Sequence, residues 1–158
     1  MEKVARFFRL PAFERRLFIE ALFWCGLARL VILLLPFRIY ARLMGKPHAE
    51  LKEKDESSET NKTLEAATRS SLEEIGRAVR RAGRHAPWKT RKSRKTRCLV
   101  EAIAAKRMLK RRKINCRIYL GVARENDRMI AHAWLQSGNI ILTGNKNLNT
   151  FTVVSIFE

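Results

Sequence analysis

Two residues of this sequence, Cys98 and His132, have the types and the local settings that nucleophilic catalysis needs. Cys98 opens a long helical pattern, where the positive end of a helix dipole favours the thiolate form of a cysteine. His132 lies 34 residues later in a strand-like segment, Ala131-His132-Ala133-Trp134-Leu135, whose small neighbours leave the ring accessible. Because a histidine beside a thiol can act as its base, this pair predicts acyl chemistry on peptide bonds.

Each of these residues alone also has an ordinary structural interpretation. A buried cysteine is most often a packing residue, and a histidine on a strand is often hydrogen-bonded within the core. The other histidines are weaker candidates, because His48 lies beside a polar segment and His85 in a turn that contains proline. Trp134 shares a strand face with His132 and is expected to wall the site and exclude water.

The residue that orients the imidazole is expected after a hairpin turn at Gly138-Asn139. If these two residues form the turn, His132 faces Asn145, whose side-chain carbonyl could accept a hydrogen bond from the ring. A shift of one residue places Thr143 opposite His132 instead. Residues 133–157 contain no acid, so a carboxylate from this stretch is not expected and Asn145 is the candidate.

Hydrophobic periodicity predicts helices followed by an antiparallel sheet, which is the element order of an α+β fold. Helical patterns cover residues 12–43, 64–82 and 98–113, and Gly83 suits the C-terminal cap of the second helix. Alternating patterns predict strands at residues 117–122, 129–136, 140–143 and 151–157. The expected domains are an N-terminal apolar helical segment (1–45), a polar linker (46–63) and a catalytic domain (64–158).

An apolar segment begins at Leu17 and ends at Phe37, and it is long enough to span a membrane. Glu20 and Arg29 would be costly inside a bilayer, and Pro36 is expected to end or kink the helix. Three interpretations therefore stay open for this segment. It is a membrane span, a helix lying on a membrane surface, or a helix packed against the domain or a partner protein.

The chain carries a net charge of +18 in 158 residues. About half of its lysines and arginines lie in residues 76–117, which contain one acid, Glu101, and a basic segment begins at Lys89 and ends at Arg97. Such a charge attracts nucleic acid, anionic lipid or acidic peptide, and its plain alternative is a solvated face. Zinc-finger spacing and aromatic RNA-binding signatures are missing from the sequence, so nucleic acid is not the expected partner.

Cys25, Cys98 and Cys116 make an odd number of cysteines without the spacing of a zinc site. This count argues against a disulfide framework and against a structural metal, and we expect no cofactor. The first ten residues show no signal peptide, so the expected location is the cytoplasm. Association with a membrane stays open through the apolar segment.

Several short motifs stand together in this chain. They are Pro87-Trp88, the helix sequence CLVEAIAAKRML that begins at Cys98, Leu120-Gly121-Val122, the five residues around His132, Leu142-Thr143-Gly144, and Phe151-Thr152-Val153-Val154-Ser155. Leu10-Pro11-Ala12 and Leu35-Pro36-Phe37 flank the apolar helix. In combination they resemble the B2 proteins of lasso-peptide biosynthesis, a branch of the transglutaminase-like cysteine protease superfamily.

The resemblance implies a papain- or transglutaminase-like fold and a leader peptidase, in which Cys98 is the nucleophile and His132 its base. Such an enzyme cuts the leader from a ribosomally made precursor, a B1-type protein presents the leader, and a separate cyclase closes the lasso ring. The chain departs from the family in two places. Many members have an Asp where this chain reads Thr143-Gly144-Asn145, and the basic segment before Cys98 is longer than usual.

Other functions remain open at this point. One is a basic protein that binds nucleic acid or an anionic membrane without catalysis, and another is a membrane-anchored structural protein. A third keeps the fold but transfers the acyl group to an amine instead of to water, as a transglutaminase does.

Overall fold

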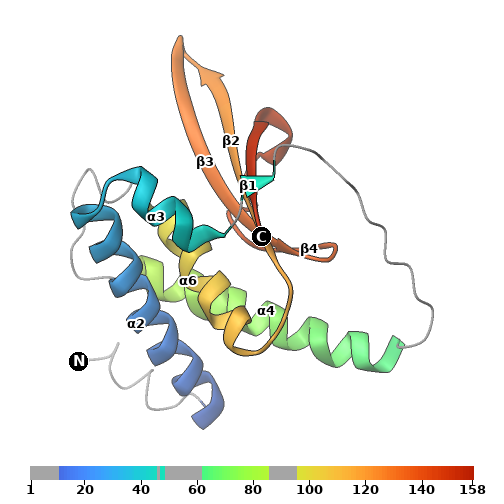
Figure 1. The fold of residues 1–158 in the computed structure, drawn as a ribbon. Coiled ribbons are helices and arrows are strands. Elements are labelled where there is room, and N and C mark those ends of the chain that lie inside the picture. Colours follow the sequence, from blue (N-terminus) through green and yellow to red (C-terminus); the bar gives the residue numbers. More distant parts are fainter. Residues whose placement is uncertain (1–10, 46, 49–61, 86–95) are drawn as a thin grey trace.

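The computed structural model describes residues 11–45, 47–48, 62–85 and 96–158. Helices gather on one side of an antiparallel sheet, so the expected α+β class is confirmed (Figure 1). The helices are α2 (Ala12–Leu34), α3 (Phe37–Met44), α4 (Lys62–His85) and α6 (Arg97–Arg111). The strands are β1 (Pro47–His48), β2 (Arg117–Glu125), β3 (Arg128–Ser137), β4 (Ile140–Thr143) and β5 (Thr152–Phe157), and a short 3-10 helix, η1 (Leu148–Thr150), precedes β5.

The apolar segment near the N-terminus folds as two helices, because Pro36 separates α2 from α3. One face of α2 packs against α4 and α6 through small and branched side chains, which are Leu17, Ala21, Cys25 and Ala28. Among the described residues, α2 is also the one helix long and apolar enough to cross a membrane. It shares a hydrophobic core with α4 and α6, so packing against the domain is the interpretation that the contacts support.

The helices α4 and α6 each bury an apolar stripe, and α6 also buries Lys106, which the sequence pattern places on the solvent side. In α4 the stripe includes Leu72, Ile75, Val79 and Ala82. The prediction that Gly83 caps α4 is wrong, because the helix continues to His85. The physical reason is contact with α6: a Cβ at Gly83 would come within 2.3 Å of the Glu101 carboxylate, so glycine is needed there for close helix packing.

The sheet has the strand order β1-β5-β2-β3-β4, and every neighbouring pair is antiparallel. Asn126 and Asp127, with φ of 48° and 59°, make the tight turn between β2 and β3. Pro47 and His48, which the sequence placed in a linker, pair with β5 as β1. The other residues of the predicted linker up to 61 lie outside the described part, and the three domain boundaries stay predictions.

The register between β3 and β4 begins as predicted and then changes. Ser137 pairs with Ile140 and Gln136 with Ile141, but a bulge brings Leu135 opposite Thr143. The predicted register is therefore wrong by one residue at Thr143, where β4 ends, and no strand pairing joins His132 to Asn145. The bulge adds one residue to β4, which moves the end of that strand relative to β3.

Candidate active site

Cys98 is the second residue of α6, whose N-terminal flank is Thr96. The first turn of the helix contains no acidic residue, so nothing there cancels the positive end of its dipole. The side chain is partly buried, and backbone N–H groups of Leu99 and Ala133 donate hydrogen bonds to its sulfur. The thiol is thus surrounded by donors that stabilise negative charge, as a nucleophilic cysteine requires.

His132 lies in the middle of β3, opposite Gly121 of β2. The helix α6 packs on β3, and the hydrogen bond from Ala133 to Cys98 shows that the start of the helix lies against the middle of this strand. The imidazole and the Cys98 thiol share a side-chain hydrogen bond, so the two residues proposed from the sequence come together. Their catalytic roles stay predictions, but their geometry is that of a nucleophile and its base.

The second nitrogen of the imidazole is held by the backbone. Nε2 of His132 lies 2.7 Å from the carbonyl oxygen of Gly144. A carbonyl can only accept, so Nε2 carries a proton and Nδ1 is the nitrogen available to the thiol. Asn145, the orienting residue predicted from the sequence, is the next residue along the chain and its side chain is exposed. The structure thus gives the orienting hydrogen bond to a backbone group, and a role for Asn145 stays a prediction.

Gly144 is the site residue that sequence reasoning missed. Its φ is +72°, and a Cβ there would lie 2.4 Å from the carbonyl oxygen of Ala133 and 2.9 Å from Cβ of Trp134. Only glycine fits both the backbone angle and the close approach to β3. The signal was a glycine directly after a strand, which often marks a positive φ or a close contact of two backbones.

The hydrogen bonds and charges favour a thiolate–imidazolium pair. Burial by itself raises the pKa of Cys98, but the hydrogen bond from His132, the N–H donors of Ala133 and Leu99, and the charge of His132 together lower it below 9.0. The hydrogen bond to Cys98 raises the pKa of His132 above 6.5, the Gly144 carbonyl and nearby negative charges add to this, and burial opposes it. Both shifts therefore move the pair toward the thiolate and imidazolium forms.

The other two cysteines have the opposite electrostatic setting. Burial, with a smaller contribution from Glu101, raises the pKa of Cys25 to about 12. Burial also raises the pKa of Cys116, against the attraction of Lys106. Both thiols are therefore protonated at neutral pH and are poor nucleophiles, which singles out Cys98 among the three.

A buried carboxylate lies one turn after the thiol. Glu101 is 5% exposed, and its Oε1 lies 3.2 Å from Nε of Arg97. Burial raises the pKa of Glu101, and the charges of Arg97, Arg80 and Arg84 oppose that rise. Its negative charge also favours the protonated form of His132, so it supports the imidazolium from outside the reacting pair.

Two aromatic side chains lie beside the imidazole. The ring of His132 lies 5.0 Å from the ring of Phe151 and 6.2 Å from that of Trp134, measured between centroids. Trp134 is buried and stacks on Tyr119 with a centroid distance of 5.5 Å. Rings on this side limit the access of water to the imidazole, and hydrogen bonds inside such a site are stronger than in solvent.

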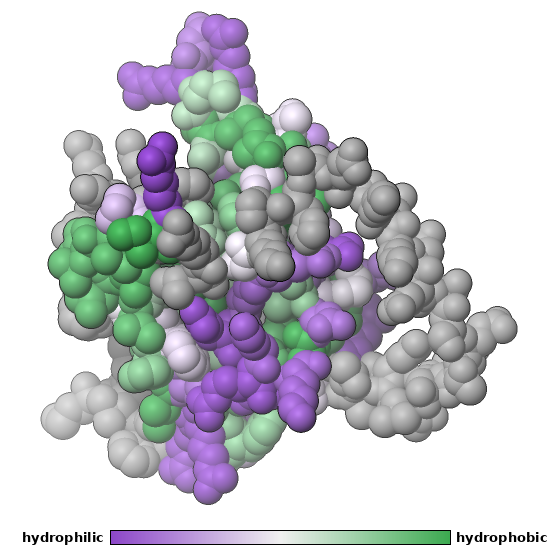
Figure 2. All heavy atoms as spheres, in the orientation of Figure 1, coloured by the Kyte–Doolittle hydropathy of each residue, from purple (hydrophilic) through white to green (hydrophobic). Residues whose placement is uncertain are grey.

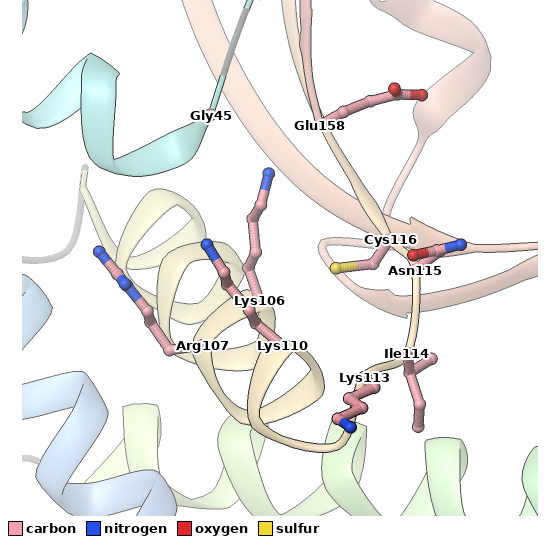
Figure 3. Close-up of a pocket in the computed structure, with 9 residues that line it drawn as sticks. All are labelled: Gly45, Lys106, Arg107, Lys110, Lys113, Ile114, Asn115, Cys116 and Glu158. Carbon is pink, nitrogen blue, oxygen red and sulfur yellow. The ribbon is translucent and has the colours of Figure 1, made fainter.

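A separate cavity of about 420 Å³ lies beside the C-terminal half of α6 (Figure 3). Its walls include Lys106, Arg107 and Lys110 of the helix, together with Cys116 and Glu158. Lys110 follows Cys98 by twelve residues, which corresponds to about 18 Å along the helix axis. This cavity is therefore not where the Cys98 thiol would meet a substrate.

Some sequence predictions fall outside the described residues. These are Pro87-Trp88, the part of the basic segment before Thr96, and the side chains of His48 and His85. Within the described part of the chain, no group of three or more His, Cys, Asp or Glu residues could hold a metal ion.

Comparison with known proteins places this geometry in a family. Residues 31–156 match the family model described as the transglutaminase-like superfamily, which covers both Cys98 and His132. No curated protein and no solved structure matches the chain. The superfamily includes cysteine peptidases and acyltransferases, and its members are commonly cysteine-dependent enzymes. Since the match spans well over half of the sequence, the chain belongs to the transglutaminase-like superfamily.

Proposed function

We propose that this protein is a cysteine peptidase that removes the leader peptide from a ribosomally made lasso-peptide precursor. The observation that carries the peptidase part is the hydrogen-bonded pair of Cys98, at the start of α6, and His132, whose other nitrogen is held by Gly144. The resemblance of the helix that begins at Cys98, of the strand around His132 and of the flanking motifs to lasso B2 proteins supports the substrate class.

The reaction follows from the protonation states of the pair. In this proposal the Cys98 thiolate attacks the carbonyl carbon at the junction of leader and core, and backbone N–H groups near the start of α6 would stabilise the oxyanion. The His132 imidazolium then donates its proton to the leaving amine, which becomes the new N-terminus of the core. The neutral imidazole next takes a proton from water, the hydroxide attacks the thioester, and the leader leaves as a carboxylic acid while the thiolate is restored.

The expected partners follow from the same proposal. The leader is the substrate, a B1-type protein binds it and presents it, and a lasso cyclase takes the released core. The strongly basic chain, at +18, would favour a leader or a presenting protein with acidic segments. We propose a cytoplasmic location, where a precursor peptide is available before export.

The proposal is tested by incubating the protein with a precursor peptide and a B1-type protein from the same source and identifying the products by mass spectrometry. We expect a leader with a free carboxylate and a core with a free amine. Cys98→Ala should abolish cleavage, and His132→Ala should reduce it by roughly 10²- to 10⁴-fold, the usual contribution of a general acid–base group. Cys116→Ala is the matched control and should retain activity.

Two outcomes would overturn the proposal. If Cys98→Ala cleaves at the native rate, the nucleophile is assigned wrongly. If an added amine is incorporated into the leader in preference to water, the protein is an acyltransferase of the same superfamily and not a peptidase. Cleavage measured at rising salt further tests the partner: unchanged rates would show that the basic surface does not bind an acidic leader or presenter.

A further inference from the structure

The outward side of α2 presents large apolar side chains to solvent. We call the following set the outer face of α2: Ile19, Phe23, Leu27, Leu30 and Leu34. Their exposed fractions run from 40% at Leu27 to 67% at Leu34, and Phe13 and Leu33 beside them are also exposed. Apolar residues gather at the left of the space-filling view, over the end of α2 next to α3 (Figure 2). A continuous patch of this kind commonly marks an interaction site.

The spacing of the outer face shows that it is one stripe of a single helix. Its residues follow one another at intervals of four, four, three and four, the periodicity that keeps side chains on one side of an α-helix. The opposite side carries Leu17, Ala21, Cys25 and Ala28, which are buried against α4 and α6. α2 is therefore apolar on both sides, and only one of them is used by the fold.

The charged residues within the stripe's length do not lie on it. Glu20 turns toward α6, where its Oε2 accepts a hydrogen bond from Arg112 at 2.8 Å and its Oε1 lies 3.3 Å from Arg111. Arg29 is half-buried on the side of Cys25, whose thiol feels its charge. The outer face therefore contains no charged group that would have to enter an apolar environment.

Basic side chains stand at both ends of this stripe. Arg16 is exposed about one helical turn before Ile19, the first residue of the outer face. Arg38 is exposed just after the break at Pro36. Ile39 in α3, beyond the break, is also exposed, at 47%. An apolar stripe with arginines at its ends matches the boundary between acyl chains and anionic headgroups.

We propose that the outer face of α2 lies in the headgroup region of an anionic membrane and attaches the protein to its surface. A membrane span is disfavoured, because crossing would remove the inner side of α2 from its core and break the ion pairs of Glu20. A second copy of this chain is disfavoured by charge, because each copy carries +18. An anionic lipid surface supplies both the apolar layer and the opposite charge.

This mode of attachment leaves the candidate active site accessible. α6 contacts α2 on one side and β3 on the other, so it lies between the outer face and the strand that bears His132 (Figure 1). The Cys98–His132 pair is therefore not covered by a membrane that contacts the outer face. The proposal does not depend on the chemistry of that pair.

Co-sedimentation of the full chain with vesicles tests the proposal. We expect the protein to sediment with vesicles of phosphatidylglycerol and phosphatidylcholine, and at least tenfold more weakly with phosphatidylcholine alone. Phe23→Glu combined with Leu30→Glu should reduce the partition coefficient at least tenfold. The matched control is Met129→Glu with Val154→Glu, which adds the same two charges at side chains 71% and 58% exposed outside α2. A third variant, Arg16→Glu with Arg38→Glu, should abolish the preference for anionic vesicles.

Several results would overturn the proposal. They are no binding of the wild type to anionic vesicles, equal loss in the control variant, and resistance to extraction by alkaline carbonate, which would show a true span. If the wild type is instead dimeric in analytical ultracentrifugation and the Phe23/Leu30 variant is monomeric, the outer face binds a second copy. If it binds no vesicle but forms a complex with an acidic presenting protein that the same variant disrupts, the face is a protein interface.

Discussion

Nε2 of His132 lies 2.7 Å from the carbonyl oxygen of Gly144, and this contact fixes the tautomer of the candidate base. Because the carbonyl only accepts, the free electron pair of the neutral ring is on Nδ1, the nitrogen left for the Cys98 thiol. A backbone carbonyl carries no full charge, so it orients the ring without the added stabilisation that a carboxylate would give to the imidazolium. Negative charge comes instead from the thiolate itself and from Glu101.

The three cysteines should react with an alkylating agent in a fixed order. At pH 7 iodoacetamide should modify Cys98 first, because its pKa is held below 9.0 while burial raises the pKa of Cys25 to about 12 and also raises that of Cys116. His132→Ala removes the largest favourable contribution, so alkylation of Cys98 near neutrality should slow by about tenfold or more. Peptide mapping by mass spectrometry gives the order and the rates.

The control for this experiment is alkylation of the unfolded chain, in which all three thiols should react alike. Preferential labelling of Cys25 or Cys116 in the folded protein would contradict the electrostatic argument, since both should be protonated. An unchanged rate at Cys98 in His132→Ala would show that the imidazole does not stabilise the thiolate.

The pH dependence of kcat/KM should be bell-shaped. Activity needs the thiolate, so it is lost as the pH falls and Cys98 is protonated. Because the pKa of Cys98 is lowered, the apparent pKa of this acid limb lies below 9.0. Activity also needs the imidazolium, so it is lost as the pH rises and His132 is deprotonated. Because the pKa of His132 is raised, the apparent pKa of this alkaline limb lies above 6.5. The two apparent pKa values belong to the coupled pair.

A precursor peptide with a fluorophore and a quencher on either side of the junction would give this profile at substrate concentrations below KM. A single limb that rises with pH to about 9, the pKa of an ordinary thiol, would contradict the ion pair.

Substitutions at Gly144 and Asn145 test which group orients the imidazole of His132, the backbone carbonyl of Gly144 or the side chain of Asn145. Gly144→Ala places a Cβ where φ is +72° and where Ala133 O would lie at 2.4 Å, so the loop must move and carry the carbonyl away from His132. We expect kcat to fall roughly 100-fold, the usual result of displacing a catalytic group by about 1 Å. Asn145→Ala should leave kcat within about twofold of the wild type, because the Asn145 side chain is exposed.

The Gly144 experiment needs a control for folding, which is the midpoint of urea unfolding of each variant. A loss of activity in Asn145→Ala as large as that in Gly144→Ala would restore the original prediction, in which the side chain of Asn145 orients the ring. The alkylation rate of Cys98 in Gly144→Ala gives a second readout, and it should fall if the imidazole has lost its position.

The sequence could predict the elements and the meeting of Cys98 with His132, because hydrophobic periodicity and segment order determine which faces pack together. It could not predict the partner of Nε2. That partner depends on a bulge between Leu135 and Gln136 in the β3–β4 pairing, and one inserted residue changes every later contact. Gly83 shows the same limit: a local signal for a helix end was overridden by packing against Glu101.

The outer face of α2 could not be predicted for a different reason. The segment is apolar almost all round, so periodicity could not show which side would face α4 and α6 and which would stay exposed. The side that is buried depends on contacts with α4 and α6, and Glu20 pairs with Arg111 and Arg112, which lie more than ninety positions away in the chain.

Replacement of Gly121 and of Gly26 by alanine should change the free energy of unfolding in opposite directions. A Cβ at Gly121 would lie 2.9 Å from the ring of Trp134 and 3.0 Å from Cβ of Phe151, the two aromatic residues beside His132. We expect Gly121→Ala to lower the free energy of unfolding by about 1–3 kcal/mol through overpacking. At Gly26, inside α2, a Cβ would meet nothing within 4 Å, so Gly26→Ala should raise it by about 0.5–1 kcal/mol.

Urea unfolding of both variants and the wild type checks the glycine prediction, and the slope with denaturant should stay constant so that the midpoints can be compared. The Gly121 substitution should also reduce cleavage, because it would displace Trp134 and Phe151, whose rings lie beside the imidazole. If Gly121→Ala is as stable as the wild type and fully active, these rings do not hold His132 in place, and the position of the base depends on Cys98 and Gly144 alone.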